Sequence, residues 1–273
     1  MCIVFIYVNS NDVHSDYKLI LISNRDESYD RPAQKLGPWI EDDNVYGGRD
    51  LQPGCEGGTW LAVSASHRKI GLLLNLPGTS KPDVKSRGKI VENYIKSDLK
   101  TTEYIDSMKE YFQGCNEFVF VSIELSDLIP IINTYNNRNN ELKSWYNQYL
   151  DFSNSLPNKP LKKVIFGKNK LEDVSRKFNK VSDKEKLIEE LITILKSEES
   201  NLPDAQLEQR QPQHFKELSS VFVKIPSKRY GTRIHTIILL TKTGEMDIIE
   251  LSMQTQVDPV APSWERTEFK LKI

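Results

Sequence analysis

The order of the apolar patterns along this chain limits the folds that it can adopt. Short β-branched runs lie toward both ends of the 273 residues, and helical periodicity is concentrated in the middle. No internal repeat is evident, and no apolar run approaches the roughly 18 residues that a membrane-spanning helix needs. Because strands and helices do not alternate, the pattern indicates an α+β protein with mixed or antiparallel sheets and two helical layers.

The expected elements follow from these periods. Strands are predicted at residues 3–8, 18–23, 59–66, 69–76, 118–123, 128–135, 220–225, 234–241 and 247–252. Helices are predicted at residues 88–99, 102–111 and within 161–196. The last stretch holds an apolar stripe from Leu187 to Leu195, with Ser182 and Glu185 spaced as a capping box. N-terminal and C-terminal strands are expected to share one core, so residues 1–273 are predicted to form a single domain.

Two polar stretches interrupt these elements. Residues 30–58 are rich in Gly and Pro and are interpreted as an ordered excursion, and residues near 197–213 as a polar loop or insert. Short basic patches at 159–163 and 228–233 are interpreted as solvated faces.

Charge and cysteine content limit the partners and the compartment. The chain has 37 Lys and Arg against 38 Asp and Glu, a net charge of −1, which gives no overall attraction to nucleic acid or to anionic membranes. Three cysteines cannot all pair within one chain, no N-x-S/T acceptor occurs, and no signal-peptide pattern is present. A cytoplasmic location is expected, and peripheral association with an organelle stays open.

Cys2 is the residue with the most specific chemical potential. Removal of the initiator methionine would make it the terminal residue, so that one amino acid supplies a thiol nucleophile and an amine base of pKa roughly 7.7–8.0. A neighbouring cation would lower the pKa of the thiol. The alternative, which position alone favours, is a small buried cysteine at the start of a strand.

Four consecutive polar residues, Asn24 to Glu27, follow the second apolar run. If the first two runs form a β-hairpin, the end of the second strand lies beside Cys2. Arg25 would then lower the pKa of the thiol, and Asp26 would orient the amine. The alternative is a solvated turn.

Asparagine and arginine recur at the ends of later apolar runs. Asn75 follows one run, Asn154 another, and Arg233 leads into a late strand. Asparagine in such a place can donate to an oxyanion, and arginine can hold a carboxylate or phosphate. Each is by itself a turn residue, but together they indicate a site.

Four motifs act as a combined signature: Met1-Cys2-Ile3, Asn24-Arg25-Asp26-Glu27, Gly57-Gly58-Thr59-Trp60 and Tyr230-Gly231-Thr232-Arg233. In combination they resemble the transport and Golgi organisation 2 family, also called NRDE proteins, from residue 2 to about residue 252. The resemblance implies the N-terminal-nucleophile (Ntn) hydrolase architecture, a four-layer αββα sandwich of two sheets between helical layers.

A more distant resemblance, to the bile-salt hydrolase and penicillin V acylase group, implies catalytic roles. By that resemblance Cys2 is the nucleophile, and Arg25 and Asp26 are the pair that tunes it. Asn75 and Asn154 are oxyanion or amine contacts, and Arg233 anchors the substrate or the nucleophile. In that group the arginine precedes the aspartate by several residues, whereas here the two are adjacent. In an extended strand they point to opposite faces unless a bulge intervenes, and an ungapped alignment places Asn24 and Glu27 in those positions.

The family resemblance also implies a function. It implies handling of haem or acyl-coenzyme A, lipid homeostasis and links to Golgi and secretory organisation, in the cytoplasm, at mitochondria or at the Golgi. The chain would hold a small hydrophobic or amphipathic anionic ligand in a hydrolase-type pocket, with no cofactor required, no metal and haem only as cargo. The expected ligand contacts are Asn24, Glu27, Arg49, Trp60 and Arg233.

Two other functions stay open. An N-terminal-nucleophile amidase would hydrolyse a small amide with Cys2, and a secretory organising factor would act through a protein surface. The four scattered histidines form no haem-attachment motif, although any of them could be an axial ligand.

Overall fold

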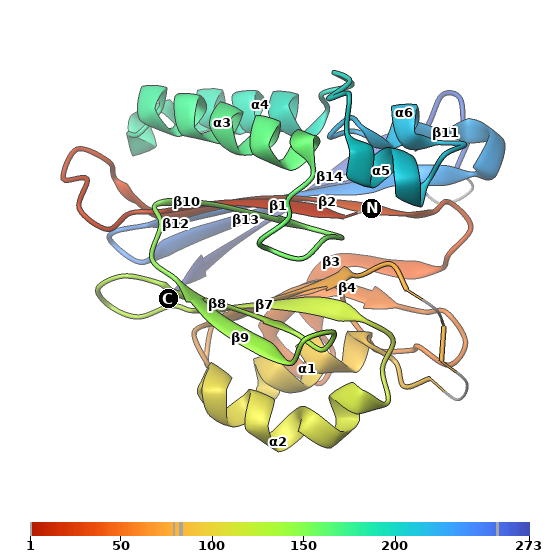
Figure 1. The fold of residues 1–273 in the computed structure, drawn as a ribbon. Helices are drawn as coiled ribbons and strands as arrows, with labels where there is room; N and C mark the ends of the chain where they lie inside the picture. The colour runs from red at the N-terminus through yellow and green to blue at the C-terminus, as the bar shows by residue number, and fades with distance from the viewer. Residues whose placement is uncertain (1, 79, 82–83, 255–256) are drawn as a thin grey trace. The chain divides into compact units, whose positions relative to one another are not determined.

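The structure is a computed structural model that describes residues 2–78, 80–81, 84–254 and 257–273. Its contacts divide the chain into two units. Unit 1 comprises residues 1–30 and 147–271, and unit 2 comprises residues 31–146 with the last two residues. Each unit contains one seven-stranded sheet with helices packed on it (Figure 1).

The sheet of unit 1 joins the two ends of the chain. Its strands run in the order β10-β1-β2-β12-β13-β14, and β11 pairs with β12. The strands are β1 (Ile3–Val8), β2 (Tyr17–Ser28), β10 (Tyr149–Ser153), β11 (Lys224–Ile225), β12 (Tyr230–Thr241), β13 (Glu245–Met253) and β14 (Trp264–Lys272). The central pair, β2 and β12, is antiparallel, so the prediction that N-terminal and C-terminal strands share a core is confirmed.

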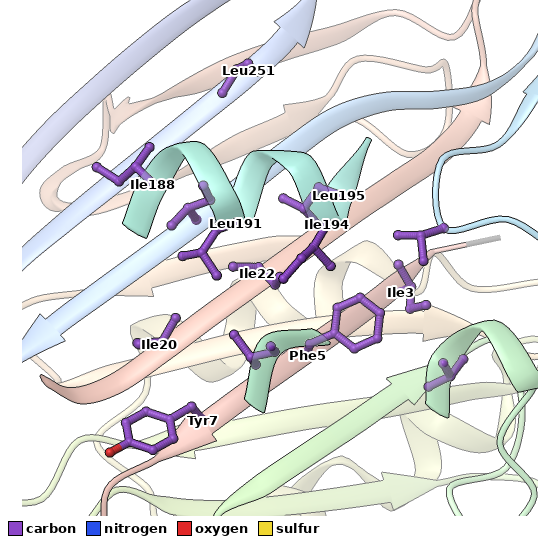
Figure 2. Close-up of a cluster of buried hydrophobic side chains, with 14 of the residues drawn as sticks. Ile3, Phe5, Tyr7, Ile20, Ile22, Ile188, Leu191, Ile194, Leu195 and Leu251 are labelled. Carbon is purple, nitrogen blue, oxygen red and sulfur yellow. The ribbon is translucent and has the colours of Figure 1, made fainter. Parts of the chain in front are cut away.

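Helices cover one face of this sheet. They are α3 (Lys162–Lys177), α4 (Lys184–Leu195), α5 (Ala205–Arg210) and α6 (Phe215–Leu218), with single 3-10 turns at η1 (Val181–Asp183) and η2 (Pro226–Lys228). The predicted stripe of α4 is buried over its whole length. Figure 2 shows its leucines and isoleucines beside Ile20 and Ile22 of β2, with Phe5 of β1 close by. Burial of each such side chain stabilises the fold by roughly 1.5–3 kcal/mol.

Unit 2 is an antiparallel meander. Its strands follow chain order, and they are β3 (Ala33–Trp39), β4 (Asp42–Asp50), β5 (Leu61–Ser64), β6 (Lys69–Asn75), β7 (Phe118–Glu124), β8 (Ile131–Asn136) and β9 (Glu141–Trp145). Its helices are α1 (Gly88–Lys96) and α2 (Thr101–Gln113). Aromatic pairs fill the layer between these helices and the sheet. The ring centroids are 5.1 Å apart for Tyr94 and Phe120 and 5.3 Å apart for Phe112 and Phe118.

The strand predicted at 220–225 is reduced to Lys224–Ile225, and the structure differs from or adds to the predictions in three other stretches. The excursion at 30–58 contains the β3–β4 hairpin, whose period-2 signal is hidden because β3 is an edge strand with Gly and Pro in it. The polar segment at 197–213 contains α5, which Asp204 caps through a 3.1 Å bond to the Leu207 N–H. The capping box is absent, because α4 begins after the η1 turn and its N-cap residue, Asp183, makes no side-chain capping bond.

The α+β class and the antiparallel sheets agree with the sequence analysis. A single domain over 1–273 and a four-layer Ntn-type stacking of the sheets remain predictions.

The close packing of α3 against β1 generates the first test. A Cβ on Gly167 of α3 would lie 2.1 Å from the ring of Phe5, which is fully buried. We expect Gly167→Ala to destabilise the protein by about 2 kcal/mol, because overpacking of up to about 3 kcal/mol outweighs a helix-propensity gain of about 1 kcal/mol. Urea unfolding measures this free energy. Gly37→Ala, where a Cβ meets nothing within 4 Å, is the control, and equal stability of the two variants would contradict the packing argument.

Candidate functional site

Cys2 lies just before β1, beside the polar end of β2. The register pairs Ile3 with Asn24, so the predicted juxtaposition of Cys2 with the Asn24–Glu27 tetrad is confirmed. The Cys2 Sγ donates to the carbonyl oxygen of Asp26 at 3.8 Å. Ile3 also pairs with Ser153 on the other side, which places Asn154 next to Cys2 along the strand direction.

The surroundings of Cys2 favour the neutral thiol over the thiolate. Burial raises the pKa of Cys2, and the Asp26 carboxylate raises it as well, while Arg25 lowers it by less than burial raises it. Nucleophilic chemistry at this thiol therefore needs a base to accept its proton.

Asp26 is held by neighbouring hydroxyls. Thr232 Oγ1 donates to Asp26 Oδ1 at 2.6 Å and accepts a 2.9 Å bond from the Val223 N–H, which fixes the direction of the hydroxyl proton. The Tyr230 hydroxyl donates to the Asp26 carbonyl at 3.4 Å. The late Tyr230–Arg233 motif thus meets the early tetrad within one sheet.

Lys163 is a site residue that the sequence analysis missed. It lies in the first turn of α3, is 1% exposed, and donates from Nζ to the Ser220 carbonyl at 3.0 Å. Burial lowers the pKa of Lys163, whereas the negative charge of Asp26 and of a Cys2 thiolate would raise it. Lys163 therefore belongs electrostatically to the Cys2–Asp26 group.

The interpretation of both basic patches as solvated faces was wrong for one residue in each. Lys163 and Arg233 are buried. The signal for Lys163 is a buried stripe every four residues along α3, made of Lys163, Gly167, Leu171 and Ser175. Its mixed polarity hides it from a search for apolar periodicity.

Arg25, Glu27 and Arg233 form a second group. Arg25 Nη2 lies 3.7 Å from Glu27 Oε2, and Arg233 Nη1 donates to the Ser28 carbonyl at 2.8 Å. Burial lowers the pKa of Arg233, and so does the positive charge of Arg25. Arg25 pairs with Ile234 and Asp26 with Thr232, so the register shift is on β12 and Arg233 is the extra residue. The adjacent Arg25 and Asp26 consequently point to opposite faces of β2.

Asn24 is fully buried and joins four segments. Its Nδ2 donates to the carbonyls of Leu195, at the end of α4, and Val221, at 2.8 and 3.0 Å. Since both amide donors are oriented by carbonyls, Oδ1 faces His235 of β12, 2.6 Å from its Nδ1. Nδ1 therefore carries the proton, and His235 is the neutral tautomer protonated there.

His235 is sealed in an aromatic environment. Its ring stacks on Trp264 at 4.7 Å with a 20° interplanar angle, and Phe222 lies 5.5 Å away. Within the described parts of the chain, Nε2 has no hydrogen-bond partner. Burial lowers the pKa of His235 to about 3, with a further contribution from Lys196.

Asn75, Arg49 and Trp60 belong to unit 2 and are described with it. Asn75 ends β6 and is exposed, and the half-buried Trp60 precedes β5. A Cβ on Gly48 would lie 2.3 Å from the Trp60 ring, so the glycine allows the ring to lie against β4. That Asn75, Arg49 and Trp60 lie near Cys2 remains a prediction.

Arg49 contributes to a surface pocket of about 160 Å³ in unit 2. The pocket is lined by Gln34, Trp39, Ile40, Glu41, Arg49, Leu51 and Gly57. The Arg49 guanidinium lies 4.0 Å from the centre of the Trp39 ring. Gly57 has φ +73°, and a Cβ there would lie 2.7 Å from Arg49 Nη2, which accounts for glycine in the Gly57–Trp60 motif.

An ion network surrounds this arginine. Arg49 Nη1 contacts Glu41 at 2.8 Å and Nη2 contacts Glu92 at 3.5 Å. Lys96 contacts both carboxylates, at 3.3 and 3.1 Å, and Lys89 contacts Glu92 at 2.7 Å. Among the residues that the structure describes, three cations of this network therefore face two carboxylates, which leaves one positive charge beside the pocket.

Searches for other site types are restricted to the described residues. Within residues 2–78, 80–81, 84–254 and 257–273, no group of three or more His, Cys, Asp or Glu side chains could hold a metal ion. No helix in that same part of the chain is long and apolar enough to cross a membrane.

The geometry defines a class: an α+β protein in which a cysteine at the start of an antiparallel sheet lies beside a buried Asp–Thr–Lys group. Residues 1–255 match the model of the family described as Transport and Golgi organisation 2, and the chain belongs to that family.

Similar proteins span its full length. The Transport and Golgi organization protein 2 of Drosophila melanogaster is 36% identical over 288 residues, covering 99% of this chain and 98% of that protein. The homologue of Bos taurus is 32% identical, covering all of both chains, and that of Homo sapiens is 30% identical, covering 100% of this chain and 99% of its own.

His235 generates a pH prediction. Its pKa is about 3 in the folded chain and near 6.5 when unfolded, so between these values the unfolded state binds more protons. Its contribution to stability is therefore complete above about pH 6.5 and falls by about 1.4 kcal/mol per pH unit below it. We expect urea unfolding to show that the stability difference between wild type and His235→Gln shrinks from pH 7.5 to pH 5. Parallel pH profiles would contradict the assignment.

Proposed function

We propose that the chain serves transport and Golgi organisation, the role in its relatives' names, by binding an amphipathic anion such as an acyl-coenzyme A or haem. The observation that carries the proposal is the pocket of unit 2, where Arg49 stacks on Trp39 beside exposed apolar side chains. Membership of the family is consistent with a carrier of this kind, which would act in the cytoplasm, at mitochondria or at the Golgi.

The charge of the pocket supports an anionic ligand group. Arg49 offers a planar fork of donors suited to a phosphate or carboxylate, and its ring stacking holds that fork in place. The neighbouring network leaves one positive charge uncompensated. An anion would therefore replace water rather than meet net repulsion.

The size and the rim of the pocket support an amphipathic ligand. About 160 Å³ is less than the roughly 300–1,000 Å³ that encloses a drug-sized ligand, so the pocket would hold the acidic end alone. Ile40, 98% exposed, and Leu51, 47% exposed, both line it. These side chains would cover part of the ligand's apolar body and lose contact with water in doing so.

The first test of the carrier uses Ile40, whose exposed side chain can be replaced without disturbing buried packing. We expect Ile40→Asp to weaken binding of palmitoyl-coenzyme A about tenfold, because it removes apolar contact area and adds a like charge. Fluorescence titration measures the dissociation constant, and haemin is titrated in parallel. The matched control is Val13→Asp, an 80% exposed apolar residue of unit 1, which should bind as wild type does. If neither palmitoyl-coenzyme A nor haemin bound saturably to the wild type, the carrier proposal would be rejected.

A second candidate, a Cys2 amidase, is supported by the buried group of unit 1. With the initiator methionine removed, the α-amine of Cys2 would take the thiol proton as the sulfur attacks an amide carbonyl. The protonated amine would then give that proton to the leaving amine as the C–N bond breaks, and water would hydrolyse the thioester to release the acid and restore the thiol. Asp26, fixed by Thr232, would orient that amine, and Lys163 would balance the carboxylate's charge. Asn154, which follows β10, would supply an oxyanion contact.

Two measurements on the purified native chain test the amidase. Intact-mass analysis is expected to show a chain that lacks methionine, and Cys2→Ala is expected to abolish hydrolysis of short-chain acyl p-nitroanilides. Cys55→Ala, which removes another half-buried free cysteine, is the control and should retain hydrolysis. Retention of Met1, or hydrolysis that survives Cys2→Ala, would exclude terminal-amine catalysis while leaving palmitoyl-coenzyme A binding untouched.

A further inference from the structure

Glu41 makes both of its ion-pair contacts through one oxygen. Its Oε1 lies 2.8 Å from Arg49 Nη1 and 3.3 Å from Lys96 Nζ. Both cations also lie over the Trp39 ring, at 4.0 and 5.3 Å from its centre. A single carboxylate oxygen thus bridges two cations that a common aromatic surface holds in place.

The two acids of the network differ in how firmly they are held. Glu92 is a buried residue of α1, its side chain is 9% exposed, and it contacts Arg49, Lys89 and Lys96. The Glu41 side chain is 45% exposed, whereas that of Arg49 is 12% exposed. Glu92 is therefore the buried counterion of the arginine, and Glu41 is the one that solvent can reach.

The position of Glu41 in the chain allows it to leave. Trp39 pairs with Asp42, so Ile40 and Glu41 form the two-residue turn of the β3–β4 hairpin. A side-chain rotation at a turn moves the carboxylate into solvent without breaking a strand bond. The Glu41 side chain is 45% exposed, so solvent already screens its side of the pair and hydrates the carboxylate when it moves away.

We propose that Glu41 is a built-in competitor for the ligand's anionic group. The carboxylate occupies the position between Arg49 and Lys96 that a phosphate or carboxylate of the ligand takes on binding, and the ligand displaces it. This inference rests on the proposed function and deepens it. It names the two cations that receive the anion and the residue that sets the affinity threshold, so that weakly charged lipids are not retained.

Removal of the competing charge should strengthen binding. We expect Glu41→Gln to bind palmitoyl-coenzyme A about two- to tenfold more tightly than wild type at low salt, and the gain to shrink at high salt. The control is Asp43→Asn, which removes one negative charge two residues away. Asp43 contacts Asn44 at 3.1 Å, and no described cation forms an ion pair with it. A purely long-range charge effect would raise both affinities equally, whereas displacement raises only that of Glu41→Gln.

The outcomes separate this inference from the function on which it rests. Wild-type binding with no gain in Glu41→Gln, or an equal gain in Asp43→Asn, would overturn the competitor role and leave the carrier proposal standing. If wild type, Glu41→Gln and Arg49→Lys all failed to bind palmitoyl-coenzyme A, both the competitor role and the carrier proposal would be rejected. A gain in Glu41→Gln that is abolished in the double variant Glu41→Gln/Arg49→Gln would support the assignment of Arg49 as the receiving cation.

Discussion

The buried amide of Asn24 is the interaction on which unit 1 depends. It ties the centre of the sheet to the end of α4 and to the Val221 carbonyl, and it fixes the tautomer of His235 on the neighbouring strand. A buried amide with its donors and its acceptor all bonded costs little, whereas loss of one partner leaves several polar groups unsatisfied at about 1–3 kcal/mol each. The helical layer is therefore aligned with the sheet by hydrogen-bond geometry in addition to apolar packing.

This constraint divides the Asn24–Glu27 tetrad between two tasks. Asn24 and Asp26 lie on the helix-facing side of β2, where one joins segments and the other meets Thr232 and the charge of Lys163. Arg25 and Glu27 lie on the opposite side and contact each other. Strand alternation explains why four adjacent polar residues occur in a buried strand: two serve the interior of unit 1, and two remain for other contacts.

Sequence periodicity was sufficient where each face of an element is uniform in polarity. The bounds of β1 and the stripe of α4 were predicted correctly, because β1 is wholly buried and α4 has one apolar side. Periodicity failed for the edge strands β3 and β14, whose outward residues are polar, and for Lys163, which occupies a buried stripe of mixed polarity on α3. Burial of a lysine depends on partners far away in sequence, here the Ser220 carbonyl, and no local pattern encodes them.

The same reasoning explains why the two proposed chemistries belong to different units. A thiol nucleophile needs a neighbouring base that can accept its proton and charged groups that orient that base, and unit 1 places Asp26 and Lys163 around Cys2. A carrier needs a cation next to exposed apolar surface, and the pocket of unit 2 places the Arg49–Trp39 pair beside the exposed Ile40.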